Sequence, residues 1–431
     1  MASGECDGKK ECRLKNMVAE FDKLVIFDKL KEQHWTGREN MAQNIEITSF
    51  GNSTKQDRRL LKQFVDFHWQ HYKQESQFVP LLDYEYLGFK LLGLVGFFEP
   101  HNLFYKHADM RFFLAMKNGK TVGRCNAFMN HSHNKYWNDK VGFFGQFEAI
   151  DDPAVSTALL DAAEDWLASQ GADTIRGPQN LPVNEATPGC LTNGFNSRPV
   201  MYYHYNKPYY GNLLQASGLE PAKKIYSWEV RVQNPMEEKL VRVAQKVIDR
   251  YNLVIEDWGD RPLNVRKQEM FEIYNDAWSD NWGFVPFTQE EFYHIVDEMM
   301  LVMDKKLFLF IYVKDEPAAF FGGVLNITEK LQPLSWCRRC ELLRAGKMLL
   351  TKNNCKGFRL GYLGVKKKFR RLGLDGVMLW KQKQYTQSAN FEYCDIGWVL
   401  EDNTLTRRLV ELMGAKDSKE YTVFEKKIKE S

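Results

Sequence analysis

The sequence predicts an α/β protein that contains two copies of one folding unit. Three observations predict it: a hairpin pattern that occurs twice, a helix-to-strand ending that occurs twice, and a glycine-containing turn from a strand into a helix. The hairpin pattern covers residues 112–123 and again 308–322. The endings cover 213–228 and 409–424, with the same spacing between their parts. The turn lies at 361–376, and two copies of one α/β unit account for the repeated patterns.

Length and composition indicate a large protein with ordinary cores. With 431 residues, of which 44% are hydrophobic, the chain can fill two or three domains. It has no run of about eighteen uncharged apolar residues and no signal-peptide layout, so neither a transmembrane helix nor export is predicted. Its eight cysteines are scattered, which suits a reducing compartment and predicts a cytoplasmic location.

The first forty residues differ from the rest of the chain. They carry many charges without a strong hydrophobic period, which predicts a disordered leader over residues 1–40. A strand-like alternation follows at residues 44–49. We therefore expect the two copies at residues 41–232 and 233–431.

In the first copy, an apolar strand at residues 141–149 leads into a helix through acidic residues. Asp151 and Asp152 stand at the start of this helix, and Pro153 suits its first turn. Two carboxylates repel a phosphate group, so the first copy is not expected to hold a phosphate-bearing ligand.

Two later segments of the first copy are candidates for an acceptor pocket. They are the loop at residues 176–185, which contains Asn180, and the aromatic run at residues 201–210, which contains His204. The alternative is an ordinary interdomain loop with aromatic packing.

The second copy carries a concentrated positive charge. Between Cys337 and Arg371 there are twelve Lys or Arg residues and one acidic residue, Glu341, so this segment has a net charge of +11, whereas the whole chain has +3. The end of the charged segment coincides with the strand-to-helix turn, where backbone N–H groups and a helix N-terminus favour anions. This predicts a diphosphate-binding site; the alternative is a solvated basic face without a ligand.

These residues resemble the acyl-CoA binding motif of the GNAT acyltransferase superfamily, written V-x-P-x-Y-R-G-x-G-x-G/A. The matching positions are Val365, Phe369, Arg370, Gly373 and Leu374, and the departures are Lys367, Arg371 and Asp375. A second match lies downstream. The segment at 391–399 resembles the family's fifth strand, and 403–415 resembles the following helix, with Asn403, Leu409 and Gly414 at the family's spacing. Val410 stands where the family often has a tyrosine that protonates the departing thiolate.

The resemblance implies that each unit has a mixed, mostly antiparallel central sheet flanked by helices, and that the first unit is a degenerate copy. It also implies acyl-CoA as co-substrate. Cys337 and Cys340 could start a zinc site, but no second pair or suitable histidines follow, so no metal is expected. The residues expected to bind acyl-CoA are Leu363, Gly364, Val365, Lys366, Lys367, Arg370, Arg371, Leu372, Gly373, Leu374, Asp375, Gly376 and Asn403.

The chain after Met41 also resembles a group of bacterial tandem-GNAT proteins, on the segments 275–286, 369–375 and 398–403. Some members of this group are similar to bacterial ceramide synthases, which join a fatty acyl-CoA to the amine of a sphingoid base. The resemblance therefore implies an acyl-CoA-dependent N-acyltransferase that acts on a small-molecule or lipid amine, with a long acyl chain. Two alternatives stay open: an aminoacyl-tRNA-dependent transferase of the peptidoglycan-bridge type, in which the basic segment grips tRNA, and a non-catalytic, ligand-binding double module.

The implied reaction predicts a catalytic arrangement. Backbone N–H groups of residues 363–365 would hold the thioester carbonyl, and a base would take a proton from the amine. Glu401 and Asp402, at the exit of the fifth strand, are the first candidates for this base, and Tyr362 and Tyr421 are weaker ones; the alternative for Glu401 is a helix cap or a surface carboxylate. The acceptor side is expected to include Asp280, Asn281, Trp282, Asn180 and His204.

Two apolar segments suggest contact with lipid. Residues 334–350 mix Trp, Leu and Met with Arg and Lys, as interfacial helices do, and residues 86–98 are apolar but too short to span a bilayer. They predict peripheral contact with the anionic inner face of the cytoplasmic membrane. The alternative is packing between the two copies.

Overall fold

The computed structural model describes residues 45–90, 93–334 and 339–428, without the side chains of 416–418. The leader predicted for residues 1–40 lies outside this range. In the first half the elements are β1 (Ile45–Phe50), α2 (Lys55–His71), α3 (Asp83–Leu87), η2 (Leu103–Lys106), β2 (Ala108–Lys117), β3 (Lys120–Asn130), α4 (His131–Trp137), β4 (Val141–Ala149), α5 (Pro153–Ser169), β5 (Thr174–Gly177), β6 (Cys190–Asn193), α6 (Tyr210–Ala216) and β7 (Glu220–Arg231).

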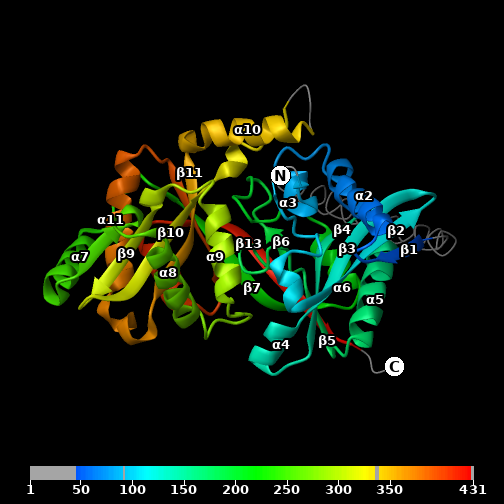
Figure 1. Ribbon diagram of the computed structural model, residues 1–431, viewed down its shortest axis with the longest axis horizontal. Helices are drawn as coiled ribbons and strands as arrows, with labels where there is room; N and C mark the ends of the chain where they lie inside the picture. The colour runs from blue at the N-terminus through cyan, green and yellow to red at the C-terminus, as the bar shows by residue number, and fades with distance from the viewer. Residues whose placement is uncertain (1–44, 91–92, 335–338, 429–431) are drawn as a thin grey trace, which may run out of the picture. The chain divides into compact units, whose positions relative to one another are not determined.

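The second half continues the series of helices and strands (Figure 1). Its elements are α7 (Glu238–Tyr251), β8 (Val254–Asp257), η3 (Trp258–Asp260), α8 (Leu263–Ala277), α9 (Gln289–Met299), η4 (Lys305–Leu307), β9 (Phe308–Val313), β10 (Glu316–Leu325), η5 (Ile327–Glu329), α10 (Glu341–Thr351), η6 (Lys352–Asn354), β11 (Gly357–Val365), η7 (Lys367–Leu372), α11 (Leu374–Ser388), β12 (Tyr393–Leu400), α12 (Thr404–Leu412) and β13 (Lys416–Lys427).

The strands form one sheet in the order β1-β2-β3-β4-β5-β13-β7-β12-β11-β10-β9-β8, and β6 pairs with β13 beside this path. Pairing is parallel between β4 and β5 and between β11 and β12. Antiparallel pairs join most of the other neighbours, including β3 with β4, β7 with β12 and β10 with β11. The predicted α/β class, with a mixed, mostly antiparallel sheet in two related units, is confirmed.

The two halves exchange their last strands. Strand β7 closes the first half of the sequence but pairs with β12 of the second half, and β13 closes the second half but pairs with β5 of the first. The exchanged strands also pair with each other, from Lys416↔Glu229 to Glu425↔Glu220. The sequence halves 41–232 and 233–431 therefore share strands at the centre of the sheet, and whether each is a folding unit stays a prediction.

The local signals in the sequence correspond to the observed elements. Between β9 and β10 the predicted second hairpin turns at Lys314 and Asp315, which both have positive φ, as a tight two-residue turn requires. Asp152 caps α5, since its carboxylate accepts the N–H of Ala154 at 3.0 Å, with Pro153 in the first turn. The predicted helix start at these residues is confirmed.

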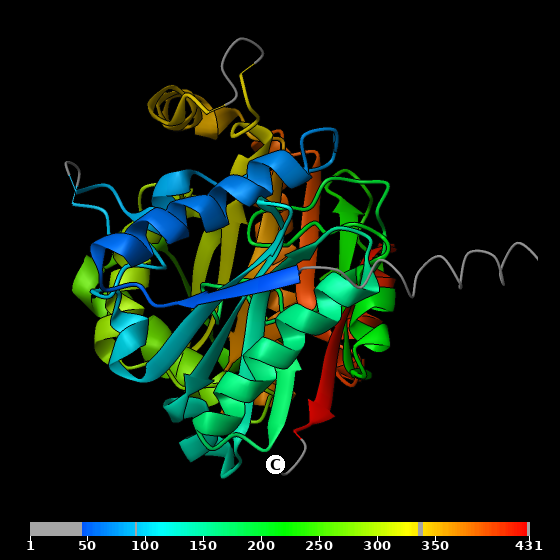
Figure 2. The same cartoon turned by 90° about the vertical axis from the view of Figure 1, so that its right-hand side faces the viewer.

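Helices pack against the sheet on the apolar side chains of the strands. Strand β9 is buried at every position, and Phe310 stacks on Phe320 of β10. Helices α8 and α11 contact β10 and β11, and α5 contacts β4, where it is seen running along the strands in Figure 2. In the described part of the chain, no helix is long and apolar enough to cross a membrane.

A loop fills the space where β4 and β5 separate in the first half. Their pairing ends at Phe143 and Arg176, and the chain after β5 returns to β4. The Gln179 N–H donates to the carbonyl of Phe144 at 2.7 Å, and the Asn180 side chain accepts the N–H of Gln146 at 2.7 Å. The separated strand ends are thus bonded by the protein's own loop. This is a physical reason, besides Asp151 and Asp152, for the degenerate character predicted for the first copy.

Gly145→Ala should loosen this loop. A Cβ at Gly145 would stand 1.9 Å from the carbonyl oxygen of Gln179, so the loop must move or the strand must bend. Overpacking of this kind costs about 1–3 kcal/mol, measured as a lower free energy of unfolding in urea. The matched control is Gly346→Ala in α10, where no described atom lies within 4 Å of the new Cβ and helix propensity predicts a small gain. Equal stability of the Gly145→Ala protein and the parent would contradict this account.

Candidate active site

Strands β11 and β12 pair over a short stretch and then separate. The parallel pairing joins Gly357–Leu360 to Tyr393–Ile396. Beyond it, β11 keeps its antiparallel partner β10 as far as Val365, while β12 follows β7 as far as Leu400. The facing edges of β11 and β12 are therefore unpaired beyond this point. At the corresponding place in the first half, the loop after β5 fills the space between β4 and β5.

Backbone N–H groups of β11 point toward this unpaired edge. The Lys366 N–H donates to the carbonyl of Ala318 at 2.9 Å. This bond shows which residues of β11 point their N–H groups toward β10. Because antiparallel strands alternate their bonded residues, the N–H groups of Leu363 and Val365 face the side from which β12 has diverged. A bulge at Gly361 shifts the register just before them. The predicted carbonyl-binding N–H groups thus lie at the open edge.

The basic turn follows directly. Residue 366 leaves β11, η7 carries the remaining cations, and Gly373 at φ 79° leads into α11. Because Gly373 has no side chain to cap the helix, the first N–H groups of α11 are available to an anion. Asp375 lies in the first turn of α11, where a carboxylate is favoured by the helix dipole. The predicted strand-to-helix turn is confirmed.

Carboxylates occupy this turn in the structure. The backbone N–H of Lys367 donates to Asp276 at 2.5 Å, and its ammonium group donates to Asp280 at 2.7 Å. Lys368 pairs with Glu316 at 2.6 Å. Carboxylates from α8, from the loop after it and from β10 thus make the kind of bonds with the turn that phosphate oxygens make. Asp280 and Glu316 are exposed, so a phosphate ligand can replace these two at low cost.

The predicted acyl-CoA residues divide into three groups. Residues 363–373 form the open edge and the turn. Leu374 is buried in the core, so its side chain supports the turn from below. Asn403 lies at the start of α12, where its side chain accepts the N–H of Thr406 at 3.2 Å. Their contacts with acyl-CoA stay a prediction.

Glu185, from the loop between β5 and β6, is a carboxylate with a strongly altered environment near the open edge. Burial raises its pKa to about 7, and Arg359 opposes this rise only in part. The side chain is half-buried, so it keeps access to a ligand. A carboxylate with a pKa near 7 can take up and release a proton at neutral pH.

Arg359 fixes this loop to the diverging strands. Its guanidinium donates to the carbonyls of Glu185, Met201 and Gly397, each at 3.1 Å. Gly397 belongs to β12, and Arg359 itself belongs to the paired part of β11. One buried side chain therefore holds the Glu185 loop beside the place where the two strands part.

Two tyrosines share the environment of Glu185. Burial raises the pKa of Tyr362, and the charge of Glu185 adds to the rise. The pKa of Tyr202 is also raised, by burial and by the charges of Glu85 and Glu185. Both phenols therefore keep their protons at neutral pH. Tyr362, predicted as a catalytic residue, lies on β11 directly after the Gly361 bulge.

The other predicted catalytic residues have bonding partners of their own. Asp402 pairs with Lys223 at 3.0 Å on the exposed end of β12, and Glu401 accepts the backbone N–H of Lys224 at 3.2 Å. Tyr421 is buried on β13 and donates its hydroxyl to the carbonyl of His204 at 3.1 Å. Each has a structural role here, and their roles in catalysis stay a prediction.

A pocket of about 490 Å³ adjoins the Glu185 loop. Its wall is mainly apolar and aromatic, and it includes the predicted acceptor residue His204: His68, Phe78, Val79, Leu81, Tyr86, Pro199, Val200, Tyr202, Tyr203, His204, Tyr205 and Thr328. Burial lowers the pKa of His204 to about 4, so the imidazole is neutral at pH 7. Tyr203 links this His204 pocket to the strands, because the Arg359 guanidinium lies 4.6 Å from its ring centre.

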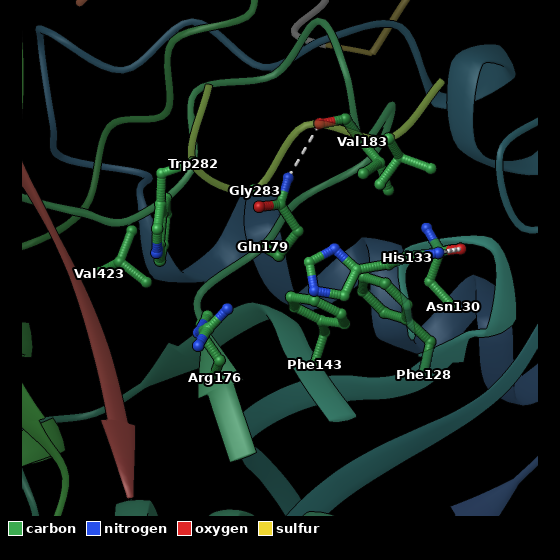
Figure 3. A pocket seen from close by; sticks show the side chains of 12 residues that line it. Phe128, Asn130, His133, Phe143, Arg176, Gln179, Val183, Trp282, Gly283 and Val423 are labelled. Atoms are coloured by element: carbon green, nitrogen blue, oxygen red, sulfur yellow. Dashed lines mark hydrogen bonds between the residues drawn. The ribbon is translucent and has the colours of Figure 1, made fainter. Parts of the chain in front are cut away.

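A second pocket, of about 400 Å³, lies on Trp282 (Figure 3). Figure 3 shows His133 and Arg176 pointing into it. Val183, which also lines this pocket, stands two residues before Glu185 in the sequence. Trp282 covers Arg176 at 5.0 Å, whereas Asp280 faces the basic turn. Asn180, held against Gln146, serves the loop that fills the first half. The predicted acceptor residues are thus spread over several places.

Sequence reasoning named the loop at residues 176–185 but missed Glu185 as a base. The available signal was Arg359, a charged residue in an apolar strand, which requires buried partners. In the described ranges, no group of three or more His, Cys, Asp or Glu residues could hold a metal ion.

The chain is similar to known proteins along most of its length. It is 30% identical over 340 residues to "Bacterial ceramide synthase" of Caulobacter vibrioides (strain NA1000 / CB15N), covering 75% of this chain and 85% of that protein. It is 28% identical over 381 residues to "Protein YghO" of Escherichia coli (strain K12), covering 85% and 93%. A solved tandem GNAT protein from the clavulanic acid biosynthesis pathway, at 10% identity and a TM-score of 0.52, covers 90% of this chain and 100% of its own. No protein-family model matches.

Glu185→Gln should stabilise the protein at alkaline pH. The folded-state pKa of about 7 lies above the ordinary value of 4.5, so the charged form is disfavoured in the folded state. The parent protein therefore loses stability as pH rises from about 4.5 to about 7, by up to about 3 kcal/mol, and the variant does not. Urea unfolding at pH 5 and pH 8 measures this. Glu411→Gln, on the exposed face of α12, is the control. A pH-independent difference between Glu185→Gln and the parent would contradict the assignment.

Proposed function

This chain belongs to the tandem GNAT N-acyltransferase family, and on that basis we propose that it transfers a long-chain acyl group from acyl-CoA to the primary amine of a sphingoid base. The observation that carries the proposal is the unpaired edge of β11, which lies between a cationic turn and a carboxylate with a pKa near 7. The turn suits the phosphates of CoA, and the edge suits the thioester.

The open edge supplies electrostatic stabilisation. When an amine adds to a thioester, negative charge develops on the carbonyl oxygen. The N–H groups of Leu363 and Val365 face the open edge and are fixed by the bonding of β11 to β10. They would stabilise this oxygen without reorganisation.

Glu185 acts as the base in this proposal. The amine nitrogen attacks the thioester carbon, Glu185 takes a proton from the nitrogen, and a C–N bond forms. The C–S bond then breaks, and the CoA sulfur leaves with a proton, for which Tyr362 is the proposed donor. Burial keeps both groups in the required form, since it raises the pKa of Glu185 to about 7 and holds the Tyr362 phenol neutral.

The proposed acceptor class rests on the His204 pocket and on the relative named a ceramide synthase. The mainly apolar and aromatic wall of this pocket suits an alkyl chain. The amine end would then meet Glu185, because Tyr202 belongs to the pocket and shares the environment of that carboxylate.

Purified protein, palmitoyl-CoA and sphinganine should give an N-acyl product and free CoA in equal amounts, measured by mass spectrometry and thiol titration. Arg370→Glu/Arg371→Glu should lose this activity and CoA binding by calorimetry, because it reverses two charges of the basic turn. Glu238→Lys/Lys239→Glu, a charge swap at the start of α7, is the control. Product formation only with aminoacyl-tRNA, or unchanged CoA affinity in the double variant, would contradict the proposal.

Glu185→Gln should lower kcat by about 100-fold or more with little change in KM, and the parent's rate should rise with pH through about 7. In the variant this pH dependence should be absent. Glu401→Gln provides the comparison, since the sequence predicts Glu401 as the base. A loss confined to Glu401→Gln would place the base at the exit of β12 instead.

A further inference from the structure

Helix α10 presents a continuous apolar face to solvent. Its leucines at positions 342, 343, 349 and 350 are 60%, 51%, 48% and 87% exposed. At 100° per residue these four positions fall on one side of the helix. Single exposed leucines are common on protein surfaces, but four on one short helix mark an interaction surface.

The opposite face of α10 holds the helix in place. Arg344 is fully buried and donates to the carbonyls of Pro80 and Leu331. Glu341 pairs with Arg344 at 2.8 Å and accepts the N–H of Asp83 at 2.7 Å. The leucines are therefore held outward by buried polar bonds. In both ribbon views α10 lies at the margin, outside the helices that cover the sheet (Figures 1 and 2).

The charge around this face is positive. Lys347 and Lys352 supply this charge, whereas the one carboxylate between Cys340 and Cys355, Glu341, is turned inward and paired with the buried Arg344. Lys347 is exposed beside the leucines. Lys352 donates to the carbonyl of Leu301, whose side chain is 58% exposed, which extends the apolar surface beyond the helix.

The buried face of α10, opposite the leucines, adjoins the His204 pocket. The carbonyl that Arg344 binds belongs to Pro80, and its neighbours Val79 and Leu81 line the pocket. A molecule that leaves a lipid layer beneath α10 would thus meet an apolar wall of this pocket.

We propose that α10 and Leu301 dock the protein on the surface of an anionic lipid bilayer, with the leucines at the boundary between headgroups and acyl chains and the lysines among the headgroups. Apolar residues flanked by cations fit such a surface, whereas a second copy of this face would bring like charges together. Delivery of a lipid amine into the His204 pocket rests on the proposed function; the docking itself does not.

Sedimentation with vesicles tests the docking. The full chain should bind vesicles of equal parts phosphatidylcholine and phosphatidylglycerol, and bind less to phosphatidylcholine alone or at high salt. Leu349→Glu/Leu350→Glu should lower this partition by about tenfold or more, because two apolar side chains are replaced by charges. Leu405→Glu/Leu412→Glu, at exposed leucines of α12, is the matched control and should bind like the parent.

Two outcomes would overturn the docking: no binding of the parent to anionic vesicles, or a parent dimer, by light scattering, that Leu349→Glu/Leu350→Glu dissociates without any effect on vesicles. The activity assay separates this inference from the proposed function. The variant should acylate a short, water-soluble amine like the parent and lose activity only on a vesicle-borne amine. Vesicle binding without acylation of any amine would refute the proposed function and leave the docking in place.

Discussion

The pairing of β7 with β13 is the constraint on which the rest of the structure depends. Each strand ends one half of the sequence and lies beside the other half, so the sheet runs through both copies without a break. Strand β6 is tied to β13 through Leu191↔Tyr421, and β5 is tied to it through Phe424↔Gly177. Both ends of the loop that carries Glu185 are thus fixed to a strand of the second half. Without the exchange, a residue of the first copy would have no fixed position at the open edge of the second.

Buried polar groups complete this junction. Asp395 on β12 is buried, which raises its pKa to about 7, and Lys419 on β13 is buried, which lowers its pKa to about 8. The Lys419 ammonium donates to the carbonyls of Gly194 and Ser197 and to the Ser197 hydroxyl. Arg359 meets three further carbonyls. Such groups add little net stability, but leaving any of them without partners is costly, so they select one arrangement of loop and strands.

Much of the fold could be predicted from the sequence because its signals are local. Turn residues identified the hairpins, Asp152 and Pro153 identified the start of α5, and glycines with cations identified the turn after β11. The exchange of β7 and β13 could not be predicted, because the two strands carry similar alternating patterns and nothing local distinguishes their partners. Glu185 was missed for the same reason. Its raised pKa arises from residues distant in the sequence. Glu401 and Asp402 were predicted as the base because they directly follow a strand.

The basic turn could be predicted from the sequence only in part. Its charge and glycines were visible in the sequence, but the carboxylates that meet them were not. Asp276, in the last turn of α8, and Asp280, just after this helix, both bond to Lys367. Because Trp282 follows these residues directly and lines the second pocket, a phosphate ligand that displaces the two aspartates also acts on the segment that shapes that pocket. The basic turn and the second pocket are therefore physically connected.

The shared strands also bear on how the protein is made. On the ribosome, β7 emerges long before β12 and β13, so the first copy leaves the exit tunnel with an apolar edge that nothing yet covers. Its sheet can be completed only after β13 has been synthesised. Nascent chains of this architecture must therefore be shielded until β12 and β13 have both left the ribosome.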